Sequence, residues 1–157
     1  MIDNNQHYMQ FAIEMALKNL KSGGGPFGAV IVKDDVIIAS SGNSVTVDND
    51  PTAHAEINAI RKAAKVLNSF DLSGCTIYSS CEPCPMCLGA IYWARIDTLF
   101  FSATRVDAEN AGFSDAMIYN EIGMPIHKRT LQTEHLVTEN AELPFEEWKN
   151  LLNKTLY

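Results

Sequence analysis

The start of the chain carries a helical pattern of apolar residues. Asp3, Asn4 and Asn5 can cap a helix, and glycines 23–25 can end it. Between them, apolar side chains recur every three or four residues, which predicts an amphipathic helix. The apolar positions of this helix are Tyr8, Phe11, Ala12, Met15, Ala16 and Leu20.

The pattern then changes to two β-branched apolar runs, at residues 27–33 and 36–41. Only Asp34 and Asp35 separate them, so we expect a hairpin of two antiparallel strands, although Asp-Asp is a weaker turn signal than Asn-Gly. Residues 50–52 next supply a cap and an early proline for a second helix. The apolar face of that helix contains Ile57, Ile60, Ala64 and Leu67.

Strands and helices alternate over the rest of the chain. The predicted segments are a strand at 76–79, a helix at 83–94, a strand at 98–103, a broken helical stretch at 107–122, a strand at 134–138 and a helix at 144–152. Strands separated by helix-length segments indicate βαβ crossovers. We therefore predict an α/β fold, a three-layer α/β/α sandwich. Its five-stranded mixed sheet is expected to be largely parallel, with one antiparallel hairpin.

Length and composition favour one compact domain over residues 1–157. A chain of 157 residues buries roughly two-thirds of its unfolded surface and needs no disulfides to fold. It contains no stretch of eighteen apolar residues and begins with a polar, acidic segment, so we predict neither a membrane span nor a signal peptide. We therefore expect a cytoplasmic protein, whose four cysteines are metal ligands or buried thiols and not disulfides.

The charge of the chain favours a small substrate over a polynucleotide. The formal net charge is −7, with nineteen acidic against twelve basic side chains, and the longest basic neighbourhoods are Arg61 and Lys62 with Lys65, and residues 127–129. A protein that binds a phosphate backbone needs clustered Lys and Arg to displace counterions. We predict no nucleic-acid partner and no membrane partner.

Two short motifs carry the candidate chemistry. Residues 52–56 contain His54 and Glu56, and residues 81–87 contain Cys84 and Cys87. One imidazole and two thiolates provide three zinc ligands, and a catalytic zinc site leaves its fourth position to water. The spacing therefore predicts a catalytic Zn²⁺ site with Glu56 left unattached beside it.

The predicted elements explain why these residues can meet. Both pairs fall in the first turns of predicted helices, where side chains reach a point just beyond the helix end. Cys84 and Cys87, three residues apart, lie on one helical face. Glu56 lies about 200° around the helix from His54, so it is poorly placed to bind the same metal and better placed to face water and substrate. Zinc lowers the pKa of its bound water to roughly 7, and a nearby carboxylate can carry the protons that amine hydrolysis requires.

Each motif alone permits other interpretations. His54-x-Glu56 is common at helix starts, and Cys84-x-x-Cys87 also suits a structural zinc knuckle or a redox pair. With Cys81 the cysteines form C-x-x-C-x-x-C, which opens a ferredoxin motif, but no fourth cysteine follows at that spacing. We interpret Cys75 and Cys81 as small buried thiols.

Together, the H-x-E and P-C-x-x-C motifs resemble those of zinc nucleobase deaminases. Over nearly its whole length the chain resembles bacterial guanine deaminases of the small, cytidine-deaminase-like class. The segments that carry the resemblance are GPFGAVIV at 25–32, NDPTAHAE at 49–56, CPMCLGAIYWAR at 84–95, AGFSD at 111–115 and the ending 144–157. The resemblance implies a cytidine-deaminase-like fold and hydrolysis of guanine to xanthine and ammonia. His54, Cys84 and Cys87 would then hold zinc, and Glu56 would shuttle protons.

The resemblance also implies roles for residues outside the zinc motifs. Asn43 and Asp115 would contact the purine, and Phe27 and Trp93 would form walls of its pocket. It further implies a swapped homodimer, in which the C-terminal segment, about residues 130–157, crosses to the partner and Tyr157 helps to close the partner's active site. From the residues alone, Asn43 and Asp115 equally suit a turn and a helix cap, Phe27 and Trp93 suit a core, and Tyr157 suits a frayed end.

Other functions share the zinc core. tRNA adenosine deaminases have the same motifs but hold RNA with basic surface, usually including a basic C-terminal region. The last twenty residues here are acidic on balance, and their charged side chains are Glu139, Glu142, Glu146, Glu147, Lys149 and Lys154. Cytosine or aminotriazine deamination remains a further alternative, as does a silent zinc-stabilised scaffold. In such a scaffold we would expect Glu56 to be replaced.

Overall fold

A computed structural model describes residues 4–157 of the chain. Backbone packing divides it into two units, Met1–Asp115 and Ala116–Tyr157. The elements of the first unit are α1 (Asn4–Lys21), β1 (Gly25–Lys33), β2 (Val36–Asn43), α2 (Val45–Asp48), α3 (Ala55–Val66), β3 (Cys75–Cys81), α4 (Pro85–Trp93), β4 (Thr98–Ala103) and α5 (Arg105–Asn110). The second unit contains α6 (Ala116–Ile122), the 3-10 helix η1 (Ile126–Lys128) and α7 (Leu143–Asn150). The predicted cap residue Asp3 lies outside the described residues.

The first unit is built on a four-stranded mixed sheet in the order β2-β1-β3-β4. β1 pairs antiparallel with both β2 and β3, and β3 pairs parallel with β4. The predicted hairpin is confirmed: Asp34 and Asp35 both have positive φ angles, 49° and 61°, as a two-residue type I′ turn requires. α4 forms the crossover between β3 and β4, which is why that pair is parallel.

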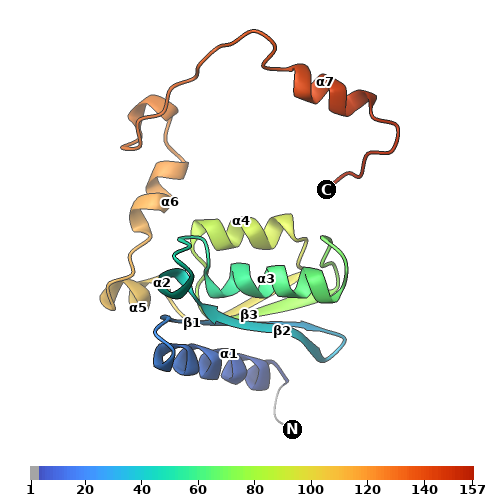
Figure 1. The fold of residues 1–157 in the computed structure, drawn as a ribbon. Helices are drawn as coiled ribbons and strands as arrows, with labels where there is room; N and C mark the ends of the chain where they lie inside the picture. The colour runs from blue at the N-terminus through green and yellow to red at the C-terminus, as the bar shows by residue number, and fades with distance from the viewer. Residues whose placement is uncertain (1–3) are drawn as a thin grey trace. The chain divides into compact units, whose positions relative to one another are not determined.

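Helices cover both faces of this sheet (Figure 1). α1 packs on one face, and α3 packs on the other with α4 beside it. Alternate side chains of β1 point to opposite faces of the sheet and so enter two different buried clusters. Ala29 and Ile31 pack in the cluster with α3, and Val30 and Val32 pack in the cluster with α1. Gly28 allows the close approach of α1, because a Cβ there would clash with the backbone carbonyl oxygen of Ala12.

Two features of the predicted sheet are wrong. The sheet has four strands and not five, because residues 134–138 form no strand in the described chain and are exposed. The sheet is also not largely parallel, since only one of its three strand pairs is parallel. The short turn at Asp34–Asp35 fixes one antiparallel pair, and the long connection from β2 to β3 lets β3 return beside β1 in the opposite direction.

The second unit differs from the first in the burial of its residues and the length of its helices. None of its residues is buried, and its helices are short. Its exposed apolar side chains include Leu143, Phe145, Trp148, Leu151 and Leu152. Among the described residues of both units, no helix combines the length and apolar character that crossing a membrane requires.

Candidate metal centre and active site

Two helix starts bring the candidate metal ligands together. His54 is the N-cap residue of α3, and Cys84 is the N-cap residue of α4, each with extended backbone angles. Pro85 occupies the first turn of α4, where its missing N–H costs no hydrogen bond, and Cys87 follows in the same turn. The side chains at the two helix starts can therefore point to one place, as the sequence predicts.

The distances between these side chains fit a zinc ion. The Nδ1 atom of His54 lies 3.6 Å from the Sγ of Cys84 and 3.4 Å from the Sγ of Cys87. All three ligand atoms lie within 4.8 Å of one another. Tetrahedral coordination with bonds of about 2.3 Å to sulfur and about 2.0 Å to nitrogen places ligand atoms roughly 3.5–3.8 Å apart. A donor set of two sulfurs and one imidazole at this spacing suits Zn²⁺ and leaves the fourth coordination position free of protein in the described chain.

The protonation of these groups also suits metal binding. The hydrogen bond with Cys87, assisted by that with His54, lowers the pKa of the Cys84 thiol to about 4. The same hydrogen bond and burial raise the pKa of Cys87. The hydrogen bond with Cys84 in turn raises the pKa of His54. A lowered thiol pKa favours the thiolate form that binds metals, and metal binding releases the protons that the other groups hold.

Glu56 lies beside the three ligands and outside their cluster. Its side chain is buried in the first turn of α3. Ser79 Oγ donates a hydrogen bond of 3.0 Å to Glu56 Oε1, and Glu56 Oε2 lies 3.5 Å from Cys87 Sγ. Burial raises the pKa of Glu56, as is common for a carboxyl group that exchanges protons at neutral pH. The site thus contains a buried carboxyl group next to the sulfur of a candidate metal ligand.

Three predicted substrate residues lie in the same unit as the metal ligands. Asn43 is buried at the end of β2, where its Oδ1 accepts a hydrogen bond of 3.2 Å from the Val45 N–H. Phe27 in β1 meets Phe113 edge to face, with ring centroids 5.0 Å apart. Burial raises the pKa of Asp115, and the charge of the Cys84 thiolate raises it further.

Trp93 and Tyr157 are both largely exposed. Trp93 is 70% exposed at the C-terminal end of α4, whereas Cys84 and Cys87 are at the start of that helix. Tyr157 is 73% exposed in the second unit. Their predicted roles as pocket residues therefore stay predictions.

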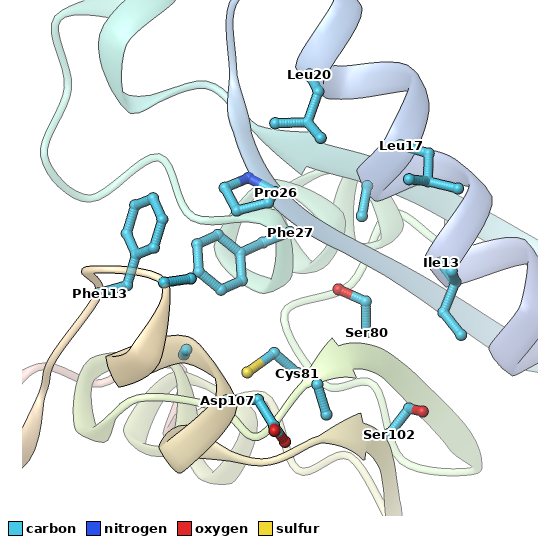
Figure 2. Close-up of a pocket in the computed structure, with 14 residues that line it drawn as sticks. Ile13, Leu17, Leu20, Pro26, Phe27, Ser80, Cys81, Ser102, Asp107 and Phe113 are labelled. Atoms are coloured by element: carbon cyan, nitrogen blue, oxygen red, sulfur yellow. The ribbon is translucent and has the colours of Figure 1, made fainter.

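The first unit contains an apolar groove of about 400 Å³, and Figure 2 shows the residues that line it. α1 contributes Leu17 and Leu20 to it, and Phe27 and Phe113 lie at one side. The lining residues include Cys81 but none of the candidate metal ligands. Cys81 and Cys75 are both buried and free, as the sequence predicts, and burial raises the pKa of Cys81 to about 11.

Sequence reasoning did not select two residues that the structure places at or near the site. Ser79 is the hydrogen-bond donor to Glu56, and Phe113 is the partner of Phe27. Ser79 follows Cys75 and Ile77 on one face of β3, and a hydroxyl in such a row is a weak signal of a buried polar contact. Phe113 lies within the AGFSD segment, which carries the resemblance without marking this residue.

Comparisons with known proteins agree with this site. The model of the cytidine and deoxycytidylate deaminase zinc-binding region matches residues 2–103. The chain is 50% identical to a guanine deaminase of Bacillus subtilis (strain 168) over 98% of this chain and 99% of that protein. It is 36% identical to a tRNA-specific adenosine deaminase of Aquifex aeolicus (strain VF5), over 96% of this chain and 98% of that one.

A solved structure supports the same relationship. The X-ray structure of guanine deaminase from Bacillus subtilis superposes with a TM-score of 0.95 and 50% sequence identity, and the match covers 97% of this chain and 98% of that one. The matched range contains all three candidate metal ligands and Glu56. The chain therefore belongs to the cytidine and deoxycytidylate deaminase zinc-binding family.

Proposed function

We propose that this protein is a zinc-dependent aminohydrolase that converts guanine and water to xanthine and ammonia. The observation that carries the proposal is a three-ligand cluster, His54, Cys84 and Cys87, with the separate carboxylate of Glu56 beside it. The near full-length similarity to a guanine deaminase supports the choice of substrate. The α/β fold, with this site at the starts of α3 and α4, supports the reaction class.

The protein groups have distinct roles in the proposed reaction. His54, Cys84 and Cys87 would hold the zinc, which supplies an activated water when bound. Glu56 accepts a proton from that water, delivers it to a ring nitrogen, and protonates the amine as the C–N bond breaks. Burial of Glu56 keeps its carboxyl group away from bulk solvent during these transfers. Water contributes the new oxygen of xanthine; one of its protons stays on the ring nitrogen, and the other joins the two hydrogens of the amine in the ammonia that leaves.

We propose that five further residues bind the purine. The amide of Asn43 and the carboxylate of Asp115 would hydrogen-bond to ring atoms and exocyclic groups, whose donors and acceptors distinguish guanine from other bases. Phe27 would pack against the ring face, with Phe113 holding Phe27 from the side. Trp93 and Tyr157 are assigned to the pocket through the family resemblance, and Tyr157 would come from a second subunit.

Deamination of adenosine in tRNA is the second candidate function. The match to a tRNA-specific adenosine deaminase over 96% of the chain favours it, and the zinc motifs serve both reactions. The net charge of −7 and the acidic C-terminal region favour a free base. We therefore expect no nucleic-acid partner.

A substrate panel tests this choice. The zinc-loaded protein is assayed for ammonia release with guanine, cytosine, an aminotriazine such as ammeline, free adenosine and a tRNA anticodon stem-loop that carries the target adenosine. We expect the highest kcat/KM with guanine. Turnover of the anticodon adenosine with none of guanine would assign the chain to RNA editing, and the absence of ammonia from every substrate would indicate a zinc scaffold.

We also propose that residues 1–157 make up a single deaminase domain and that the protein works as a homodimer. In this dimer, about residues 130–157 of each chain would cross to the partner. None of the residues in the second unit is buried, and β4 is an edge strand with Phe100 and Phe101 partly exposed. The apolar groove in Figure 2 is the surface that we propose for the partner's segment. Such a segment would cover apolar area that a lone chain leaves in water.

Light scattering during size-exclusion chromatography tests the dimer. We expect a mass of twice the 17.4 kDa of one chain, and a chain truncated after residue 129 to elute as a monomer. A full-length protein that elutes as a monomer at micromolar concentration would contradict the proposal. A dimer that survives the truncation would place the interface elsewhere.

We place the enzyme in the cytoplasm. All four cysteines are free thiols, and two of them would be zinc ligands, which suits a reducing compartment. Fractionation of cells that express the tagged protein tests this location. Recovery with periplasmic or secreted proteins would contradict it.

A further inference from the structure

The face of β3 that meets α3 and α4 changes from apolar to polar at one residue. Cys75 and Ile77 are fully buried in the core cluster that includes Ala55 and Ala59 of α3. Because side chains alternate along a strand, Ser79 continues this row, and it is only 2% exposed. A buried hydroxyl in an apolar row needs a hydrogen-bond partner, which here is Glu56.

Ser79 is held on a rigid part of the fold. β3 lies between β1 and β4, and Ser79 is paired with Ala29 on one side and with Phe101 on the other. Its Oγ donates the hydrogen bond of 3.0 Å to Glu56 Oε1. The position of this oxygen is therefore fixed by a strand that is paired along both edges.

The two carboxylate oxygens of Glu56 have different surroundings. Oε1 accepts the hydrogen bond from the hydroxyl of Ser79, whereas Oε2 accepts a longer one of 3.5 Å from the Sγ of Cys87, a weak donor that cannot donate once it binds metal as a thiolate. Fixing one oxygen of a planar carboxylate limits rotation of the group and so determines where the other oxygen lies. Without this bond, the three rotatable bonds of the glutamate side chain would allow Oε2 to turn away from the ligands.

We infer that Ser79 is a positioning residue for the deamination reaction, and that it orients Glu56 so that Oε2 faces the reacting water. The inference rests on the proposed function, in which Glu56 transfers protons. A catalytic group must be held within about 0.5 Å of its productive place, and a displacement of about 1 Å can lower the rate 10²-fold. Ser79 acts through Glu56 and does not touch the substrate.

The test compares two substitutions of nearly equal shape. Ser79→Thr keeps the hydroxyl, and Ser79→Val replaces it with a methyl group, so any packing cost of the larger side chain is common to both. We expect Ser79→Val to lower kcat about 10- to 100-fold with KM and zinc content unchanged, and Ser79→Thr to keep most of kcat. Equal losses in the two variants, or no loss in Ser79→Val, would overturn the inference.

Two further variants separate positioning from a general loss of stability. Ser79→Ala adds no atoms, so it tests the hydroxyl if the larger side chains prevent folding, and it should show the same loss of kcat. Ser80→Ala is the matched control, because Ser80 is also buried on β3 and its Oγ accepts a hydrogen bond of 3.0 Å from the Gly28 N–H. We expect both alanine variants to lower the melting temperature, and only Ser79→Ala to lower kcat at constant KM. An equal effect of both on kcat would overturn the inference.

A double substitution tests whether Ser79 acts through Glu56. Adding Ser79→Ala to Glu56→Gln should cause no further loss of kcat, because the group that it positions is no longer a proton carrier. A further tenfold loss in the double variant would overturn the inference. If Glu56→Gln alone keeps full activity, the proposed reaction mechanism fails, whereas loss in Glu56→Gln with full activity in Ser79→Ala removes only the role of Ser79.

Discussion

Replacement of Glu56 by glutamine tests the assignment of proton transfer most directly. The amide has nearly the size and shape of the carboxylate, and its oxygen can still accept the hydrogen bond from Ser79. The amide nitrogen would then take the place of Oε2, which lies 3.5 Å from Cys87 Sγ. The variant therefore keeps the packing and the zinc ligands and loses only the ability to accept a proton.

The expected effect follows from the size of general acid–base catalysis. A positioned proton-transfer group accelerates a reaction about 10²- to 10⁴-fold. Each factor of ten corresponds to about 1.36 kcal/mol, so Glu56→Gln should raise the activation barrier by about 2.7–5.4 kcal/mol. Ammonia release from guanine should fall by at least about two orders of magnitude.

Although Glu56→Gln should lower activity, we expect it not to lower the stability of the folded protein. Burial raises the pKa of Glu56, so the ionised carboxylate is less favourable in the folded protein than in the unfolded chain. This cost is absent below the unfolded pKa of about 4.3 and grows as the pH rises above it. A neutral amide removes the cost, so at pH 7 the metal-free Glu56→Gln protein should melt no lower than the parent.

The assay measures ammonia release, zinc content and melting temperature on the same preparations. Glu82→Gln is the matched control, since Glu82 lies two residues before Cys84 in the chain but its Oε2 accepts a hydrogen bond from the Arg105 N–H. We expect this control to keep kcat close to that of the parent. Turnover by Glu56→Gln within tenfold of the parent, with zinc retained, would refute the assigned role.

Three more predictions concern the metal, the core and the end of the chain. Cys84→Ala should lose zinc and activity, whereas Cys81→Ala should keep zinc, as measured by metal analysis after dialysis; equal loss in both would favour a cluster of all three cysteines. Leu72→Ala, at a fully buried position, should lower the free energy of unfolding in urea by about 2–5 kcal/mol, against less than about 1 kcal/mol for the half-exposed Leu20→Ala. Deletion of Leu156 and Tyr157 should raise KM or lower kcat without changing zinc content, and unaltered kinetics would make Tyr157 a frayed end.

Local sequence patterns predicted most of the elements of the first unit. The strand at residues 98–103 was predicted at its observed bounds, and the hairpin turn at Asp34–Asp35 at its observed position. These features depend on the period of apolar residues and on the backbone of adjacent residues, which a sequence displays directly. Helix starts are similarly local, which is why His54 and Cys84 were placed at the ends of α3 and α4.

Strand pairing was harder to predict because it depends on contacts between distant residues. The segment at 134–138 has the composition of a strand but pairs with no strand in the described chain. The direction of β3 relative to β1 follows from the path of a long connection, which no local pattern encodes. The contact of Ser79 with Glu56 is of the same kind, since it joins a strand to a helix that lies 23 residues earlier.

The contrast between local motifs and distant contacts also explains why the type of reaction is easier to predict from the sequence than the substrate. The proposed reaction depends on the candidate metal ligands His54, Cys84 and Cys87, which two helix starts supply and which short motifs are sufficient to predict. Recognition of guanine is assigned to separate segments, Asn43 at the end of β2 and Tyr157 at the end of the chain among them. An enzyme can therefore keep its zinc motif while the surrounding segments change the base that it accepts, as the similarity to both guanine and tRNA adenosine deaminases illustrates. Loss of a metal ligand should abolish every deamination equally, whereas changes at the recognition segments should alter the ratio between substrates.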